Sequence, residues 1–272
     1  MNFQQKLEER IKKNNTLVCI GLDTEVGKIP KHLFSSDTAM FDFNKAIVDK
    51  TADLVCCYKA NSAFYESAGA EGIVQLKMTF DYIKGTYPDI PIILDAKRAD
   101  IGNTNEGYVQ YAFSYLKADA ITLHPYLGAE ALYPFLKLAD KGLFILCRTS
   151  NPGAAEFQDL MIESEPLYLY VARKVIHEWN ANNNCMLVVG VTGYEEIQLL
   201  RQIAPNMFFL VPGVGVQGGD LFGILRHGLT KQKSGLIIHS ARAIIYASEG
   251  QDFADAARNE TEKLRDTINK YR

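Results

Sequence analysis

The chain has 272 residues, 47% of them hydrophobic and 22% charged, and a formal net charge of −3. Because its lysines and arginines are scattered, it lacks the basic patch with which proteins bind nucleic acids or anionic membranes. Residues 1–15 contain no apolar signal segment, and no stretch approaches the roughly 18 consecutive apolar residues of a membrane helix. This composition predicts a globular cytoplasmic protein that binds neither nucleic acid nor membrane.

The five cysteines are Cys19, Cys56, Cys57, Cys147 and Cys185. Four of them lie in apolar, strand-like runs, and no pair has the spacing of zinc ligands. An odd number of cysteines in core segments predicts buried free thiols in a reducing compartment. No histidine is placed to activate one of them, which argues against a catalytic cysteine.

Short apolar runs alternate with amphipathic segments along the chain. Phe3, Leu7 and Ile11 recur at helical spacing and predict a first helix that closes one end of a barrel. Strands are expected at residues 16–22, 54–59, from 92, 120–123, 143–147, 186–189, 208–211 and 235–239, and helices at 41–52, 70–87, 106–116, 129–139, 167–180, 194–203 and 252–270. Eight strand–helix alternations without a linker predict an α/β fold, a single-domain (β/α)8 TIM barrel over residues 1–272.

Charged side chains stand where the first two expected strands end. Asp23 follows the first strand, where it is either a helix cap or a ligand for a hydroxyl group. Lys59 comes directly after five apolar residues. It is either a lysine whose amine reaches past the strand end to water or a cation at a catalytic mouth. The residues by themselves leave both pairs of alternatives open.

The third expected strand ends in three charges. Asp95 and Lys97 are two positions apart and share one face of a strand. Asp100 follows beyond the strand and is expected to return to the same cluster. Ionised groups stay inside a protein when they are paired or used in chemistry. A structural ion pair and a catalytic cluster both fit this pattern.

Two later strand ends carry polar residues. His124 follows the fourth strand and is expected to be a hydrogen-bonded structural histidine. The fifth strand leads into Thr149, Ser150 and Asn151. The segment 153–166 that comes next is long enough to close over a ligand.

Residues 213–218 match the Gly-x-Gly-x-x-Gly fingerprint of dinucleotide sites. That site needs an acidic residue about 20 positions further on, and positions 234–243 contain none. The motif instead follows the seventh strand, where barrels bind phosphate with the loops after strands seven and eight. Glycine N–H groups, Gln217 and the guanidinium of Arg242 are therefore predicted to bind a phosphate.

The string Leu-Asp-Ala-Lys-Arg-Ala-Asp-Ile-Gly-Asn-Thr at residues 94–104 resembles the signature of the orotidine 5′-monophosphate decarboxylase family, in particular of its second subfamily. The resemblance extends over most of the chain. It includes Asp23, Lys59, Ser150 within Thr-Ser-Asn-Pro-Gly, the Pro-Gly-Val-Gly-x-Gln-Gly-Gly loop and Arg242. Many relatives carry Gly immediately before that arginine, whereas this chain has Ala241.

The resemblance implies decarboxylation of orotidine 5′-monophosphate to uridine 5′-monophosphate in pyrimidine synthesis, with no metal and no cofactor. Lys97 would protonate the C6 carbanion, and Asp95 and Asp100 would keep it charged. Lys59 would balance the cluster and bind the ribose together with Asp23. The remaining substrate-binding residues implied are Ile101, Thr104, Ser150, Gln217, Gly218 and Arg242.

In the family, Asp100, Ile101 and Thr104 extend into the site of a second subunit, so the resemblance also implies a homodimer with shared sites. The nearest alternative is a magnesium-dependent sugar-phosphate decarboxylase or aldolase of the same superfamily, which shares the Asp-x-Lys-x-x-Asp string. Those relatives place a Glu at the end of strand two to bind Mg²⁺. Lys59 at that position would repel the cation.

Overall fold

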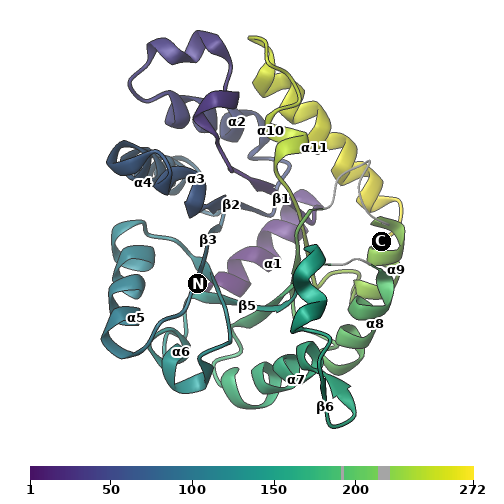
Figure 1. Ribbon diagram of the computed structural model, residues 1–272. Coiled ribbons are helices and arrows are strands. Elements are labelled where there is room, and N and C mark those ends of the chain that lie inside the picture. Colours follow the sequence, from purple (N-terminus) through teal and green to yellow (C-terminus); the bar gives the residue numbers. More distant parts are fainter. Residues whose placement is uncertain (191–192, 214–220) are drawn as a thin grey trace.

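The structure is a computed structural model that describes residues 1–190, 193–213 and 221–272. Parallel strands close into a barrel surrounded by helices (Figure 1). Around the barrel the strands follow in the order β1 (Val18–Gly21), β10 (Leu236–Ser240), β9 (Phe209–Val211), β8 (Cys185–Val189), β5 (Gly142–Arg148), β4 (Ala120–Leu123), β3 (Ile92–Arg98) and β2 (Cys57–Asn61), which pairs with β1. The expected single-domain (β/α)8 barrel is confirmed.

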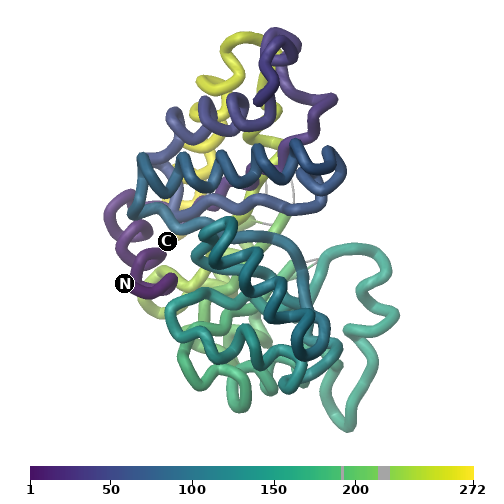
Figure 2. Tube along the Cα trace, turned by 90° about the vertical axis from the view of Figure 1, so that its left-hand side faces the viewer, coloured from purple at the N-terminus to yellow at the C-terminus, as the bar shows by residue number. Residues whose placement is uncertain are grey.

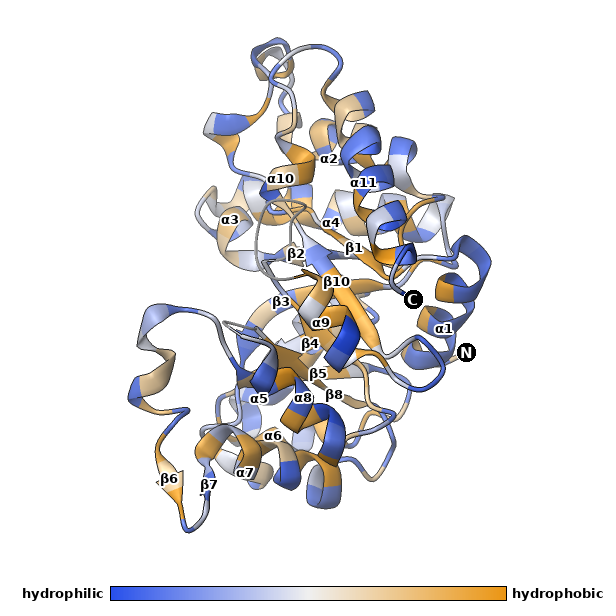
Figure 3. Cartoon of the chain, turned by 90° about the vertical axis from the view of Figure 1, so that its right-hand side faces the viewer, coloured by the Kyte–Doolittle hydropathy of each residue, from blue (hydrophilic) through white to orange (hydrophobic). Residues whose placement is uncertain are grey.

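The barrel strands are apolar because both of their faces are covered. All residues of β1, β4 and β8 are buried, as is typical of parallel strands that lie under helices. Figure 3 shows apolar strands inside a shell of helices with polar outer faces. The expected and observed strands differ only at their ends, most at β2, which begins at Cys57 rather than at Leu54.

The helices follow the predicted alternation, with additions that the sequence pattern did not indicate. In chain order they are α1 (Phe3–Asn14), α2 (Ala39–Thr51), α3 (Ser62–Glu66), α4 (Gly69–Thr86), α5 (Gly102–Val109), α6 (Gly128–Leu136), α7 (Leu167–Lys174), α8 (Tyr194–Ile203), α9 (Leu221–Gly228), α10 (Arg242–Ile245) and α11 (Phe253–Asn269). The helices expected at 106–116 and 167–180 end in π-helical segments, η3 (Gln110–Tyr115) and η5 (Val175–Trp179). Short 3-10 segments are η1 (Val26–Lys28), η2 (Lys31–Ser35) and η4 (Pro152–Glu156).

Helix α1 closes the barrel at the N-terminal ends of the strands, as predicted. A capping box between Asn2 and Gln5 starts the helix. The ring of Phe3 lies edge-on to Phe144 at 5.6 Å and covers Gly142 at the start of β5. Figure 1 shows α1 across the middle of the ring of strands. The opposite end of the barrel, where the strands end, is therefore the end left for a site.

The segment after β5 is more ordered than a simple loop. It forms η4 and a two-stranded antiparallel hairpin of β6 (Met161–Ile162) and β7 (Glu165–Pro166). Gln158 anchors its start, because its Oε1 accepts from the N–H of Thr149 at 2.8 Å and its Nε2 donates to Thr149 Oγ1 at 2.8 Å. The segment projects from the body of the barrel in two views (Figures 2 and 3). Its closure over a ligand stays a prediction.

The five cysteines are buried free thiols, as expected. Burial raises the pKa of Cys57 and of Cys147, so both stay protonated and neither is an activated nucleophile. In the described ranges, every helix is too short or too polar to cross a lipid bilayer.

Candidate active site

Charged side chains from three neighbouring strands meet at the C-terminal end of the barrel. Asp23 lies just beyond β1, Lys59 is on β2, and Asp95 and Lys97 are on β3. The strand register brings them together, since Gly21 pairs with Lys59 and Asn61 pairs with Asp95. This is the end of the barrel at which (β/α)8 enzymes carry their active sites.

Asp95 is the centre of this cluster. One carboxylate oxygen accepts from Lys59 Nζ at 2.8 Å, and the other accepts from Lys97 Nζ at 2.6 Å and from Thr122 Oγ1 at 2.8 Å. Asp23 Oδ1 lies 4.0 Å from Lys59 Nζ. The side chains of Lys59 and Asp95 are 3% and 7% exposed, whereas that of Lys97 is 47% exposed. Lys97 therefore presents its amine to the open mouth of the barrel.

The cluster keeps its charges despite burial. Burial acts to lower the pKa of Lys59, but the negative charges of Asp95 and Asp23 outweigh it and raise that pKa above its usual value. Burial acts to raise the pKa of Asp95, but Lys59 and Lys97 hold it far below its usual range. Lys59 is thus a buried, paired cation, and the alternative of an amine that reaches past the strand end to water is wrong.

The backbone at Lys97 is unusual. Its φ is 46°, and the pairing of β3 with β4 shifts register between Leu94 and Arg98, which is the mark of a β-bulge. A lysine in this left-handed conformation costs on the order of 1–3 kcal/mol. The N–H of Lys97 donates to Thr122 Oγ1 at 2.9 Å, which holds the distorted segment in place. The predicted contact of Lys97 with Asp95 is confirmed, but the bulge and not simple strand alternation directs the lysine.

Asp23 is a buried carboxylate, 9% exposed, that faces the cluster. Its Oδ1 accepts from the backbone N–H of Asn61 at 3.1 Å. The first helical residue after it is Val26, in η1, whose N-cap is Glu25. Asp23 therefore does not cap the segment that follows it, and the alternative of a ligand for a hydroxyl group remains.

Asp100 does not return to the cluster within its own chain, contrary to expectation. Its carboxylate accepts from the N–H of Ile101 at 2.7 Å, and it makes no ion pair with a described residue. Beyond the bulge, Asn105 Oδ1 accepts from the N–H of Asp100 at 2.8 Å. Ile101 is 60% exposed and Thr104 is exposed as well. None of these three residues makes a hydrogen bond or ion pair with Asp23, Lys59, Asp95 or Lys97 of the same chain.

The other predicted residues are spread around the same rim. Ser150 is exposed at the end of β5, packed against Gly190 at the end of β8. Arg242 is exposed at the start of α10 and makes no ion pair within the described ranges. Gln217 and Gly218 lie outside the described residues. The imidazole of His124 makes no hydrogen bond with a described residue, so the expected hydrogen-bonded side chain is not found there. The backbone N–H of His124 donates to Arg98 O at 3.1 Å.

Sequence reasoning missed His239, a buried histidine beside the cluster. It is 6% exposed, and neither ring nitrogen has a hydrogen-bond partner among the described residues. Burial lowers its pKa well below 6.5, and the charge of Lys59 lowers it further. A Cβ on Gly21 would lie 2.5 Å from His239 Nε2 and 2.6 Å from the Cβ of Ala241. The bare backbone of Gly21 therefore leaves the room that His239 and Ala241 occupy.

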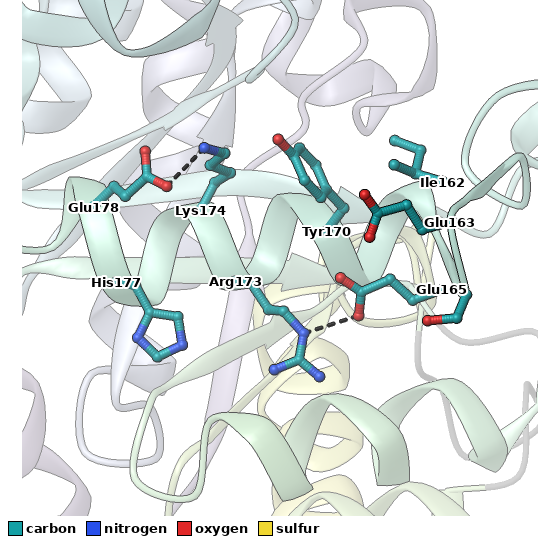
Figure 4. A pocket seen from close by; sticks show the side chains of 9 residues that line it. Ile162, Glu163, Glu165, Tyr170, Arg173, Lys174, His177 and Glu178 are labelled. Atoms are coloured by element: carbon teal, nitrogen blue, oxygen red, sulfur yellow. Dashed lines mark hydrogen bonds and ion pairs between the residues drawn. The ribbon is translucent and has the colours of Figure 1, made fainter.

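The outer surface has a separate pocket of about 270 Å³ on α7 and the β6–β7 hairpin (Figure 4). It is lined by Ile162, Glu163, Ser164, Glu165, Tyr170, Arg173, Lys174, His177 and Glu178. Two ion pairs lie within it, Arg173 with Glu165 at 2.8 Å and Lys174 with Glu178 at 2.6 Å. Within the described ranges, no three His, Cys, Asp or Glu side chains are grouped as metal ligands.

Comparison with known proteins agrees with this geometry. Residues 16–257 match the model of the family described as orotidine 5′-phosphate decarboxylase / HUMPS. An orotidine 5′-phosphate decarboxylase of Cellvibrio japonicus is 48% identical over 271 residues, which are 99% of this chain and 98% of that protein. One of Ralstonia nicotianae is 46% identical over the full length of both chains. The solved structure of Leishmania donovani OMP decarboxylase has a TM-score of 0.85 at 35% identity and covers 100% of this chain and 98% of its own. With a closed barrel, a Lys–Asp–Lys cluster at its mouth and these relatives, the chain belongs to the orotidine 5′-phosphate decarboxylase / HUMPS family.

Proposed function

We propose that the protein decarboxylates orotidine 5′-monophosphate to uridine 5′-monophosphate in pyrimidine synthesis, as a single cytoplasmic decarboxylase domain over residues 1–272. The observation that carries the proposal is the ion-paired chain of Lys59, Asp95 and Lys97 at the barrel mouth. Relatives that are 44–48% identical along nearly the whole chain bear the name of this activity. No metal ion or cofactor takes part in the proposed reaction.

Lys97 is the proposed proton donor. When the bond between C6 and the carboxyl group breaks, CO₂ leaves and the electron pair stays on C6 of the pyrimidine. The ammonium group of Lys97 stabilises this charge and then transfers a proton to C6. Its 47% exposed side chain and its ion pair with Asp95 at 2.6 Å suit a cation that must reach a substrate.

The buried charged residues next to Lys97 determine the electrostatic potential in the site. Asp95 keeps the amine charged and places negative potential beside the substrate carboxylate. Lys59 balances Asp95, and with Asp23 it binds the ribose hydroxyls. A carboxylate and an ammonium group, 4.0 Å apart, offer both an acceptor and donors for a diol.

We assign the phosphate to Arg242 and to the loop that contains Gln217 and Gly218, and a contact with the substrate to Ser150. Arg242 is exposed and makes no ion pair with a described residue, so its guanidinium is available for bidentate binding of a phosphate. Binding energy from this remote group serves to assemble the site around the pyrimidine. Loss of Arg242 should therefore reduce turnover as well as affinity.

We also propose a homodimer with shared sites, in which Asp100, Ile101 and Thr104 reach the site of a second copy. Exposed apolar side chains lie on α6 and in the segments before α5 and α6, where Ile101 is 60%, Tyr126 85% and Tyr133 64% exposed. A hollow of about 440 Å³ opens beside Thr104. Exposed apolar surface of this kind is typical of an interface between subunits.

The first experiment follows the ultraviolet absorbance of orotidine 5′-monophosphate with and without EDTA. Wild type should consume the substrate equally in both conditions. Lys97→Ala should lose on the order of 10²–10⁴-fold or more of this activity, the range of one general acid. Lys45→Ala, which removes an exposed lysine paired with Asp49 at 2.8 Å, should behave as wild type.

The outcomes are distinct. Absence of turnover by wild type would reject the assignment and return the chain to the magnesium-dependent sugar-phosphate enzymes, with Mg²⁺ as the next addition. Turnover that EDTA abolishes would reject metal independence. Turnover that survives in Lys97→Ala would reject Lys97 as the proton donor.

A further inference from the structure

We propose that Tyr246 is a positioning residue that connects the phosphate-binding helix α10 to the loop that carries Asp23. This inference rests on the proposed function, because it takes Arg242 as a phosphate ligand and Asp23 as a ribose ligand. It concerns how the relative positions of these two residues, which follow different strands, are maintained. Five contacts of Tyr246 carry the argument.

The hydroxyl group of Tyr246 binds the backbone on both sides of Thr24. It accepts from the N–H of Glu25 at 2.7 Å and donates to the carbonyl oxygen of Asp23 at 3.3 Å. A single hydroxyl group therefore sets the path of the chain directly after the Asp23 side chain. Residues 23 and 246 are far apart in sequence, so this bond depends on the closed barrel.

The backbone of Tyr246 is bonded to Arg242 itself. The N–H of Tyr246 donates to the carbonyl oxygen of Arg242 at 3.2 Å, across the single turn of α10. A displacement of Arg242 on binding a phosphate is thus carried by one hydrogen bond to Tyr246 and by the next to Asp23.

The ring of Tyr246 cannot swing away freely. It is stacked on Phe43 at 5.8 Å, and Phe43 is stacked in turn on Phe253 at 5.0 Å. On the loop side, Lys28 Nζ lies 5.9 Å from the centre of the ring and pairs with Glu25 at 2.7 Å. Burial raises the pKa of Tyr246 to about 12, so the hydroxyl group keeps its proton and remains a donor near neutral pH.

A second tyrosine provides a matched comparison. The hydroxyl group of Tyr65 donates to the carbonyl oxygen of Leu22 at 2.7 Å and accepts from Asn44 Nδ2 at 2.8 Å. Tyr65 therefore holds the residue before Asp23, as Tyr246 holds Asp23 itself. Its partners are Asn44 on α2 and Leu22 just beyond β1, so the described hydrogen bonds of Tyr65 give it no connection to Arg242.

The test is a pair of double-mutant cycles. Tyr246→Phe and Tyr65→Phe are each combined with Arg242→Ala, and kcat and KM for orotidine 5′-monophosphate are measured. Tyr246→Phe should lower kcat/KM about 10- to 100-fold in the wild-type background, since small misplacements of a binding group can cost on the order of 100-fold. In the Arg242→Ala background, Tyr246→Phe should lower kcat/KM less than about threefold, because the guanidinium that Tyr246 would position is then absent.

Tyr65→Phe should give the same fold loss in both backgrounds. Tyr87→Phe removes a hydroxyl bond to the exposed Asp49 at 3.0 Å and should change nothing. Thermal unfolding checks that Tyr246→Phe, which keeps the stacked ring, is folded; if it is not, Tyr246→Trp replaces it in the cycle.

Equal losses from Tyr246→Phe with and without Arg242 would overturn the coupling, as would a Tyr246→Phe enzyme with wild-type kcat and KM. Asp23→Asn and Arg242→Ala are assayed separately. If neither affects turnover, the failure lies in the proposed function of those residues. If both do and the cycle is additive, the failure lies in the role of Tyr246.

Discussion

Asp95 holds two lysines that differ in their surroundings. Lys59 is 3% exposed and Lys97 is 47% exposed, although both donate to the same carboxylate. Lys59 and Thr122 also donate hydrogen bonds to Asp95 from inside the barrel, so Lys97 is not the only partner of this carboxylate. Lys97 can therefore shift toward a substrate without leaving a buried carboxylate unpaired, a situation that is costly in free energy.

His239 should make the stability of the protein depend on pH. Its pKa in the folded protein lies well below 6.5, the value expected in the unfolded chain. Between these two values the unfolded state binds a proton that the folded state does not, so the free energy of unfolding falls as the pH decreases below 6.5. The slope should approach about 1.4 kcal/mol per pH unit.

Urea unfolding at several pH values between neutrality and mild acid measures this slope. His239→Leu, of similar size, should flatten it, whereas His177→Gln, at an exposed site on η5, should not. The pKa of Asp95 is lowered in the folded protein, so protonation of this carboxylate reduces the free energy of unfolding only at pH values below the usual pKa of an aspartate. An unchanged slope in His239→Leu would contradict the prediction.

At the scale of elements, α1 and β5 meet at a glycine. A Cβ on Gly142 would lie 2.5 Å from Phe3 Cδ1 and 2.9 Å from the Cβ of Ala120. The first contact belongs to the helix that closes the barrel and the second to the neighbouring strand β4. The seating of α1 therefore depends on the absence of a side chain at this one position.

Gly142→Ala should destabilise the fold by about 1–3 kcal/mol, the usual cost of overpacking. Gly85→Ala, in α4, is the matched control, because its Cβ would meet nothing within 4 Å. That change should be neutral or should stabilise the protein by roughly 0.5–1 kcal/mol. Chemical denaturation measures the free energy of unfolding of both variants. Equal values would show that α1 can shift to accommodate the new methyl group without loss of stability.

At the scale of the whole molecule, the proposed homodimer concerns the rim at Asp100, Ile101 and Thr104. Asp100 makes no ion pair with a described residue, while Ile101 and Thr104 are exposed. A second copy that binds this rim would bring Asp100 to the other copy's Lys97. This arrangement predicts activity that depends on which chain carries a given substitution.

Mixing inactive Lys97→Ala with inactive Asp100→Ala should restore about a quarter of wild-type activity after subunit exchange. About half of the dimers are then mixed, and each has one intact site of two. Lys97→Ala mixed with Asp95→Ala is the control, because both residues belong to one chain's cluster and no intact site forms. A first mixture as inactive as the control would reject shared sites.

The sequence by itself determined the barrel and the composition of its mouth. Alternating apolar and amphipathic runs specify strands and helices locally, and the ends of parallel strands must meet at one edge, so Asp23, Lys59, Asp95 and Lys97 were predictable together. Helices α3, α9 and α10 were not predicted. Of these, α3 and α10 have about one turn each, which is too short to show a period.

Only the tertiary structure decided which side chains contact across the barrel. Gly21 leaves room for His239 and Ala241, Tyr246 binds the backbone of Asp23, and Asp100 bonds to Asn105 rather than to the lysine cluster. Each of these depends on the distance between residues remote in sequence, or on a local bulge that breaks strand alternation. Periodicity and motif spacing describe neighbours along the chain, whereas packing and hydrogen bonding across a closed barrel depend on how its strands are staggered.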